Sequence, residues 1–152
     1  MQDDVRWMRL AIELAHRCPP SATAFAVGSV IVDADGREIS RGWSRESDEM
    51  VHAEESALAK LAPDDPRLGG ATLYSTLEPC GERASRPRTC AQLIIAAGIP
   101  RVVLAWREPD LFVTGAHGIA VLTAAGVEVG ELPELAEAAR EPNVHVLGRN
   151  RS

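Results

Sequence analysis

The order helix, glycine, strand occurs twice in the second half of this chain, and this repeat constrains the fold more than any other feature. Apolar residues with helical spacing follow Thr89, Gly98 ends that run, and residues 101–106 form a short apolar stretch typical of a strand. The second copy comprises residues 118–125, Gly126 and residues 127–129. A helix-length connection favours parallel pairing, because an antiparallel pair can be joined by a tight turn. The sequence therefore predicts an α/β domain whose last two strands are parallel.

The remaining elements predict a mixed sheet. Residues 27–32 are a continuous apolar run, a turn follows at residues 33–36, and residues 38–43 form a second extended segment, so the pair is expected to be a hairpin. A further strand is expected at residues 72–76, and helices at residues 5–16, 50–61 and 132–139. A hairpin followed by alternating strands and helices predicts helices on both faces of the sheet.

Length and charge favour one cytoplasmic domain that acts on a small molecule. The 152 residues contain no Gly/Ser-rich linker, so we expect a single domain over residues 1–152. The acidic start does not suit a signal peptide, no apolar window approaches a membrane span, and an odd number of cysteines suggests thiols or metal ligands rather than disulfides. The net charge of −6 argues against a nucleic-acid partner, because phosphate backbones are bound mainly by clustered Lys and Arg.

His52, Cys80 and Cys90 lie at the edges of predicted elements, where side chains distant in sequence can converge. His52 is near the start of one helix, and the two cysteines flank the start of the next. Three such ligands leave the fourth position of zinc open for water, as in catalytic sites, whereas structural zinc usually has four protein ligands. A helix N-terminus also favours the thiolate that binds metal. We predict one Zn²⁺ per chain on these three side chains; the alternative is a buried histidine and two core thiols.

Glu54 is the candidate catalytic residue. It follows His52 by two positions, so both side chains can address one metal only if the ion lies beyond the tip of the helix. There Glu54 is expected to take a proton from zinc-bound water and pass it to a ring nitrogen and the departing amine. The alternative role, an ordinary acid in the first helical turn, is assigned to Glu55.

These residues resemble the signature of the zinc-dependent cytidine and deoxycytidylate deaminase superfamily, and most closely its riboflavin-pathway branch. The segments that carry the resemblance are Val27-Gly28-Ser29-Val30-Ile31-Val32, His52-Ala53-Glu54-Glu55, Thr76-Leu77-Glu78-Pro79-Cys80, Ala96-Ala97-Gly98-Ile99 with Arg101-Val102-Val103, and Ala124-Ala125-Gly126-Val127-Glu128-Val129. The resemblance covers roughly residues 5–145. It implies a three-layer α/β/α fold with a five-stranded mixed sheet, hydrolytic deamination of a pyrimidine-type ring, and a homodimer or homotetramer.

Departures from the riboflavin branch concern the substrate more than the metal. Nine residues separate Cys80 from Cys90, one more than the branch leads us to expect. An Asn before the Val-Gly segment and a His after the second strand, which look toward substrate in the branch, are Ala24 and Ser44 here. The usual Asp-Pro-Asn after the fourth strand reads Glu108-Pro109-Asp110. The chain also ends where a reductase domain would begin in the bifunctional enzyme, so we expect a stand-alone deaminase and leave open a different substrate.

Several residues are candidates for substrate contacts, each with a structural alternative. Arg83, Arg86 and Arg88 lie in the loop between the cysteines, where they either bind a ribose phosphate or face solvent. Phe25 and Trp106 either stack on a ring or belong to the core; we favour the core for Phe25 and the pocket for Trp106.

Two acidic residues complete this set. Glu78 either bonds a substrate group or braces its loop, and Glu108 is included as a substrate contact. Cys18, His117 and His145 are expected to be structural or exposed.

The sequence leaves three classes of function to be separated. The leading one is deamination, of the riboflavin-pathway aminopyrimidine phosphate, a cytosine nucleotide such as dCMP, or a free base or nucleoside. The second is a non-catalytic zinc module, which a closed site with Cys18 as fourth ligand would favour and an intact Glu54 argues against. The third, editing of RNA or DNA bases, is disfavoured by the acidic charge.

Overall fold

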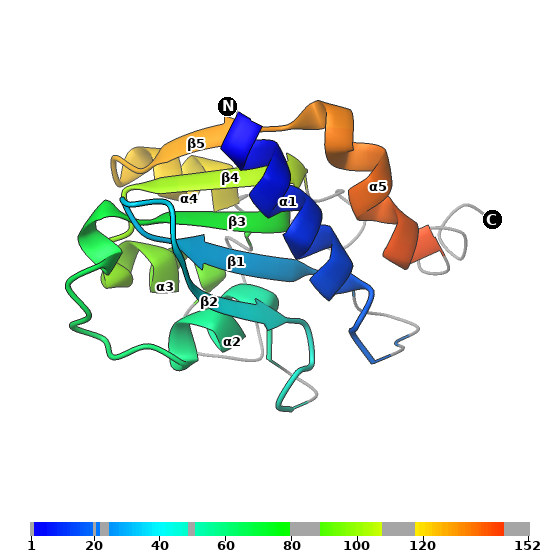
Figure 1. The fold of residues 1–152 in the computed structure, drawn as a ribbon, viewed down its shortest axis with the longest axis horizontal. Helices are drawn as coiled ribbons and strands as arrows, with labels where there is room; N and C mark the ends of the chain where they lie inside the picture. Colours follow the sequence, from blue (N-terminus) through cyan, green and yellow to red (C-terminus); the bar gives the residue numbers. More distant parts are fainter. Residues whose placement is uncertain are drawn as a thin grey trace.

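A five-stranded mixed sheet forms the centre of the computed structural model, which describes residues 2–19, 21, 25–48, 51–79, 89–107 and 118–144. The elements in chain order are α1 (Gln2–Ala15), β1 (Gly28–Val32), β2 (Glu38–Trp43), α2 (Ala53–Ala59), η1 (Leu68–Gly70), β3 (Thr72–Leu77), α3 (Cys90–Ala97), β4 (Arg101–Trp106), α4 (Gly118–Ala124), β5 (Glu128–Glu131), η2 (Pro133–Leu135), α5 (Ala136–Arg140) and η3 (Glu141–Asn143). The strand order is β2-β1-β3-β4-β5 (Figure 1). Strand β1 is antiparallel to β2 and β3, while β3, β4 and β5 are parallel, as the sequence predicted for the last two.

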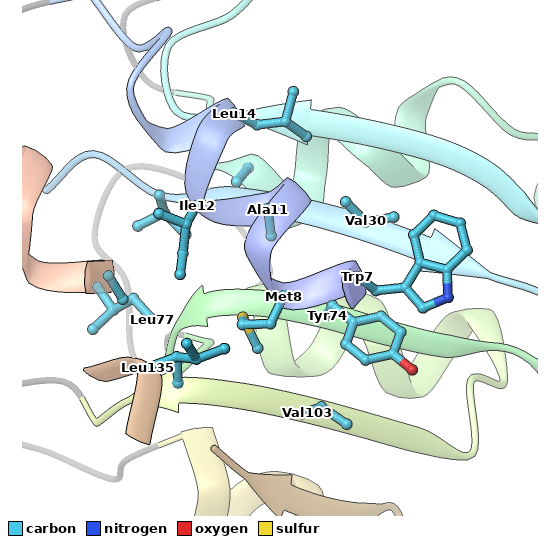
Figure 2. Packing of buried hydrophobic residues seen from close by; sticks show 14 of the residues in the cluster. Trp7, Met8, Ala11, Ile12, Leu14, Val30, Tyr74, Leu77, Val103 and Leu135 are labelled. Carbon is cyan, nitrogen blue, oxygen red and sulfur yellow. The ribbon is translucent and has the colours of Figure 1, made fainter. Parts of the chain in front are cut away.

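Helices cover both faces of this sheet and give the three-layer α/β/α architecture that the sequence predicted. Helices α1 and α5 lie on one face, and α2, α3 and α4 lie on the other (Figure 1). The α1 side is packed with large apolar residues, among them Trp7, Met8, Ile12, Tyr74 and Leu135 (Figure 2). A second buried cluster, which includes Ala57, Ile94 and Leu122, fills the space beneath the other three helices.

Glycines in the hairpin let two helices approach the strands closely. A Cβ atom at Gly28 of β1 would overlap the carbonyl oxygen of Ala11 in α1. On the opposite face, a Cβ atom at Gly42 of β2 would lie 2.6 Å from the carbonyl oxygen of Ala53 and 2.6 Å from the amide nitrogen of Ala57, both in α2. The position of α2, and so of the residues at its N-terminus, therefore depends on glycine at residue 42.

Most predicted boundaries agree with the structure, and three helices differ. Helix α1 begins at Gln2 rather than at residue 5, because acidic residues at its start are favourable near the positive end of a helix and Asp4 is buried against other elements. Helix α2 begins at Ala53 rather than at residue 50, because His52 has an extended backbone, with φ −91° and ψ 161°. The helix predicted at residues 132–139 is divided between η2, which has Pro133 at its start, and α5.

A buried polar network joins α1 to the amino-terminal ends of the parallel strands. The Asp4 carboxylate accepts hydrogen bonds from Arg101, at 2.8 and 3.1 Å, and from the Tyr74 hydroxyl at 2.5 Å. The hydrogen bonds from Arg101 hold the pKa of the Asp4 carboxyl well below its usual range, whereas burial and the neighbouring carboxylate raise the pKa of Tyr74.

In the described part of the chain, no helix combines the length and the apolar character needed to cross a membrane.

Candidate active site

The predicted site residues that the structure describes lie near the carboxyl ends of strands β3 and β4. These strands end at Leu77 and Trp106, and helices α3 and α4 follow them in the chain. Helix α2 begins next to the start of α3. Because the carboxyl ends of parallel strands lie at the same edge, loops from several elements converge at this point.

His52 and Cys90 lie side by side at the start of two helices. The Nδ1 atom of His52, the residue before α2, is 3.1 Å from the Sγ atom of Cys90, the first residue of α3. Cys90 is fully buried. The sequence placed these residues at helix starts, and the structure brings them together across 38 positions of the chain.

Local hydrogen bonds fix each of these helix starts. The backbone N–H of His52 donates to the carboxylate of Glu55 at 3.2 Å, which is the ordinary first-turn role predicted for Glu55. Before α3, the hydroxyl of Thr89 accepts the N–H of Gln92 at 3.1 Å, and the side-chain oxygen of Gln92 accepts the N–H of Thr89 at 3.0 Å. This is the capping box that the sequence predicted, and it holds Cys90 in the first helical position.

The His52 and Cys90 pair fits a shared zinc ion. Zinc–nitrogen and zinc–sulfur bonds of about 2.1 and 2.3 Å at a tetrahedral angle place the two ligand atoms roughly 3.6 Å apart. The observed 3.1 Å is close to this value, and imidazole with thiolate is a usual zinc ligand set. Cys90 also lies where the positive end of α3 favours a thiolate. Among the described residues no group of three potential ligands occurs, and Cys80, the third predicted ligand, lies outside them.

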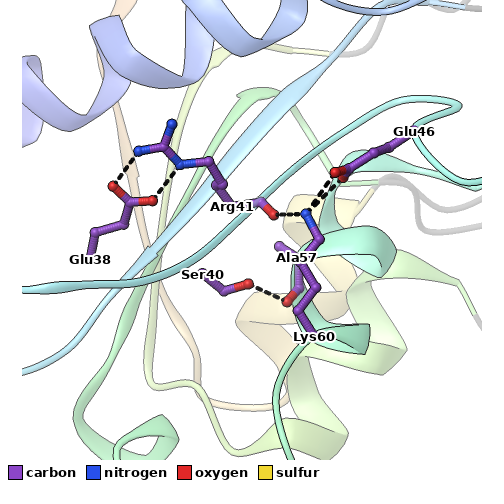
Figure 3. A network of polar contacts seen from close by, with 6 residues as sticks. All are labelled: Glu38, Ser40, Arg41, Glu46, Ala57 and Lys60. Carbon is purple, nitrogen blue, oxygen red and sulfur yellow. Dashed lines mark hydrogen bonds and ion pairs between the residues drawn. The ribbon is translucent and has the colours of Figure 1, made fainter.

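Glu54 is buried in the first turn of α2, with only 4% of its surface exposed. The side of α2 that carries Ser56 contacts β2 and the turn after it: Ser56 donates to Glu46 at 2.6 Å, and the Lys60 ammonium, just after the helix, donates to the Arg41 carbonyl oxygen at 2.6 Å. Figure 3 shows the Lys60 contacts, together with a hydrogen bond of 2.7 Å from Ser40 to Ala57 that fastens the helix to the sheet.

The direction of Glu54 follows from this attachment. Residues two apart on a helix are about 200° apart around its axis, so Glu54 lies on the side opposite Ser56. The Glu54 carboxyl is therefore buried on the side of α2 opposite Ser56. A buried carboxyl two positions from His52 is suited to proton transfer.

Glu78 braces the neighbouring helix. It is 3% exposed, its carboxylate accepts the backbone N–H of Ile119 in α4 at 3.0 Å, and its own N–H donates to the Trp106 carbonyl oxygen at 2.8 Å. These contacts join the residue after β3 to α4 and β4, and a contact of Glu78 with substrate stays a prediction.

Phe25 and Trp106 form an aromatic pair at the same edge. Their ring centroids are 5.2 Å apart with an interplanar angle of 78°, an edge-to-face arrangement. Trp106 is 8% exposed and Phe25 packs against the same core cluster.

Ser44 and Cys18, which the sequence singled out, both contact Val27. The Ser44 hydroxyl accepts the N–H of Val27 at 3.0 Å, and the Cys18 thiol donates to the Val27 carbonyl oxygen at 3.5 Å. Burial raises the pKa of the Cys18 thiol, which disfavours the thiolate that a metal needs.

The other predicted residues lie outside the described part of the chain. They are Ala24, Cys80, Arg83, Arg86, Arg88, Glu108, Pro109, Asp110, His117 and His145.

Sequence reasoning missed three residues near the site. Asn143 is fully buried and binds the backbone of Ala26 across 117 positions, a contact that no local pattern reveals. Arg45 has a left-handed backbone, with φ 60°, and its guanidinium bonds the carbonyl oxygen of Phe25 at 3.2 Å. Ser29 interrupts an apolar strand, which was the one available signal, and its buried hydroxyl has no hydrogen-bond partner among the described residues.

Sequence comparison places this arrangement in a known family. Residues 1–106 match the family described as the cytidine and deoxycytidylate deaminase zinc-binding region. The chain belongs to this family. It is also 42% identical over 127 residues to the diaminohydroxyphosphoribosylamino-pyrimidine deaminase of Schizosaccharomyces pombe, an alignment that covers 82% of the chain and 31% of the relative. The chain thus spans about a third of the length of such curated relatives.

Solved structures of deaminases from the same branch share the fold. Acinetobacter baumannii RibD superposes with a TM-score of 0.82 and 34% identity, over 97% of this chain and 40% of that chain. The Rib2 deaminase of Aspergillus oryzae, in complex with DARIPP, has a TM-score of 0.76 and 25% identity, over 95% of this chain and 96% of that chain. The cytidine deaminase-like fold predicted from the sequence is confirmed.

Proposed function

We propose that this chain is a zinc-dependent hydrolytic deaminase of a pyrimidine-type ring. The observation that carries the proposal is the 3.1 Å approach of His52 Nδ1 to Cys90 Sγ, with the buried Glu54 in the adjoining helical turn. Membership in the deaminase family supports the same reaction.

In the proposed reaction His52, Cys80 and Cys90 hold one zinc ion per chain. Bound zinc supplies the Lewis-acid chemistry that makes water a competent nucleophile near neutral pH. Glu54 accepts one proton from the attacking water as the new C–O bond forms at the amine-bearing ring carbon, and donates it to the ring nitrogen. It then takes the second proton from the new hydroxyl and delivers it to the amine as the C–N bond breaks and the C=O bond forms. Water is consumed and ammonia is released. Because only 4% of Glu54 is exposed, its carboxyl exchanges few protons with bulk solvent.

The proposed substrate is the diaminohydroxyphosphoribosylaminopyrimidine of riboflavin synthesis. Support comes from the name of the Schizosaccharomyces pombe relative and from its 42% identity to this chain. Contacts of Arg83, Arg86 and Glu108 with the substrate, a single domain over residues 1–152, a homo-oligomer and a cytoplasmic location remain predictions from the sequence.

The test is ammonia release by the zinc-loaded protein from a panel of three compounds: diaminohydroxyphosphoribosylaminopyrimidine, dCMP and cytidine. We expect the first to be deaminated with the highest kcat/KM. Glu54→Gln should lower kcat by roughly 10²–10⁴ without loss of zinc, because it removes the proton acceptor and leaves the ligands in place.

Glu55→Gln is the matched control for the Glu54 variant. It changes the adjacent carboxyl to an amide that can still accept the N–H of His52, so most of the activity should remain. Full activity in Glu54→Gln would contradict the proton-transfer role. A protein that binds zinc and deaminates none of the three compounds would instead support the non-catalytic module.

A further inference from the structure

Residues 25–28, here called the entry segment, lead into β1 and are bound through their backbone by side chains from three separate parts of the chain. Arg45, after β2, donates to the carbonyl oxygen of Phe25 at 3.2 Å, and Ser44 accepts the N–H of Val27 at 3.0 Å. In β3, the hydroxyl of Thr76 accepts the N–H of Gly28 at 3.2 Å. Each of these bonds replaces a backbone partner that a regular strand would supply.

Asn143 makes the most complete of these attachments. Its side-chain oxygen accepts the N–H of Ala26 at 2.6 Å, and its amide nitrogen donates to the carbonyl oxygen of Ala26 at 2.9 Å. The side chain thus pairs with both polar groups of one residue, as a neighbouring strand does. Asn143 is fully buried, so water is not a ready substitute for either bond.

The entry segment borders the candidate active site. The ring of Phe25 packs edge-on against Trp106, whose carbonyl oxygen accepts the N–H of Glu78. Arg45, which donates to the carbonyl oxygen of Phe25, also donates its backbone N–H to the carbonyl oxygen of Val51, the residue before His52, at 2.9 Å. The entry segment therefore lies beside the N-terminus of α2, while the described metal ligands belong to α2 and α3 and are held by other contacts.

We infer that Asn143 is a positioning residue for substrate binding, which acts by holding the entry segment as a rigid wall of the pocket. This inference rests on the proposed function. A wall that is already ordered spares the substrate the entropy of ordering it, so it contributes to binding. The entry segment carries neither a described metal ligand nor Glu54. A less rigid entry segment should therefore weaken substrate binding, which raises KM, and leave the chemical step, and so kcat, largely unchanged.

Asn143→Asp tests this inference with little change in volume. The aspartate keeps an acceptor for the N–H of Ala26 but places a second oxygen, in place of the amide donor, against the carbonyl oxygen of Ala26. In ammonia release from diaminohydroxyphosphoribosylaminopyrimidine by the zinc-loaded full chain, we expect KM to rise about ten-fold, with kcat changed by less than about three-fold. Zinc content should not change.

A second variant decides the outcome if Asn143→Asp does not fold. Arg45→Gly removes the guanidinium from Phe25 and suits the backbone at φ 60°, so it should fold and raise KM in the same way. Tyr74→Phe is the control, because it removes a buried hydrogen bond to Asp4 toward the opposite edge of the sheet and should leave KM and kcat unchanged.

Unchanged KM in both entry-segment variants would overturn the inference. So would a fall in kcat or zinc content at constant KM, because either result means that the segment supports the chemistry rather than the substrate. A wild-type protein that deaminates no pyrimidine contradicts the proposed function itself, and the inference then falls with it.

Discussion

The Nδ1 atom of His52 and the Sγ atom of Cys90 are 3.1 Å apart, although 38 positions separate the two residues in the sequence. Two separate local contacts determine this distance. Helix α2 is pressed onto β2 at Gly42, and α3 starts at Cys90 because Thr89 caps it. The geometry of the candidate metal site is therefore a consequence of helix placement, and changes that move either helix should alter metal binding.

Gly42→Ala should move α2. The new Cβ atom would lie 2.6 Å from backbone atoms of Ala53 and Ala57, which cannot yield as a flexible side chain can. Overpacking of this kind typically costs about 1–3 kcal/mol of stability, and here the shift should also weaken zinc binding. Urea unfolding and zinc competition with a chelator measure the two effects.

Gly130→Ala in β5 is the matched control for this change. The nearest atom to its new Cβ is 3.6 Å away, which is ordinary contact. If Gly42→Ala binds zinc and unfolds like Gly130→Ala, the close approach does not set the position of His52.

The ion pair between Asp4 and Arg101 should make the fold sensitive to acid. The pKa of Asp4 is lower in the folded protein than the 3.8 of a free carboxyl, so its stabilisation is present above about pH 4 and is lost as pH falls below that value. Asp4→Asn should cost about 2 kcal/mol at pH 7.

The difference between wild type and Asp4→Asn should shrink as the pH falls below 4, because the Asp4 carboxyl of the unfolded wild-type chain then takes up a proton while that of the folded chain stays ionised. Urea unfolding of both proteins at pH 7, 5, 4 and 3 measures it. A difference that stays constant over this range would mean that the Asp4 charge does not stabilise the fold.

Ser29 and Ser75 are paired across β1 and β3 and should respond oppositely to removal of their hydroxyls. The Ser75 hydroxyl donates to the Leu77 carbonyl oxygen at 2.7 Å, so Ser75→Ala should lose about 1 kcal/mol. The Ser29 hydroxyl is buried without a partner among the described residues, so Ser29→Ala should be neutral or stabilising. Thermal unfolding of the two variants compares them directly, and a larger loss in Ser29→Ala would mean that its hydroxyl is hydrogen-bonded in solution.

The sequence predicted the elements whose signals are local. Strand β4 spans residues 101–106 as expected, because Gly98 ends the preceding helix in a left-handed conformation, with φ 78°. The capping box of Thr89 and Gln92 was also a local pattern, and it fixed the start of α3 correctly.

Apart from the approach of His52 to Cys90, the features that depend on distant partners were not predicted. Helix α1 extends to Gln2 although the apolar spacing starts later, and Asp4 in its first turn is held by Arg101, 97 positions away. The role of Asn143 depends on Ala26 and has no sequence signal. At the site, the motif around His52 and Glu54 predicted the family, whereas the hydrogen bonds of Ser44 and Glu78 to backbone groups depend on segments that only the folded chain brings near.

The zinc content of the purified protein tests the central claim most directly. Metal analysis after reconstitution and removal of loosely bound ions should give one zinc ion per chain for the wild type and for Cys18→Ala, and essentially none for Cys90→Ala. A wild type that binds no zinc, or a Cys90→Ala variant that retains it, would contradict the account.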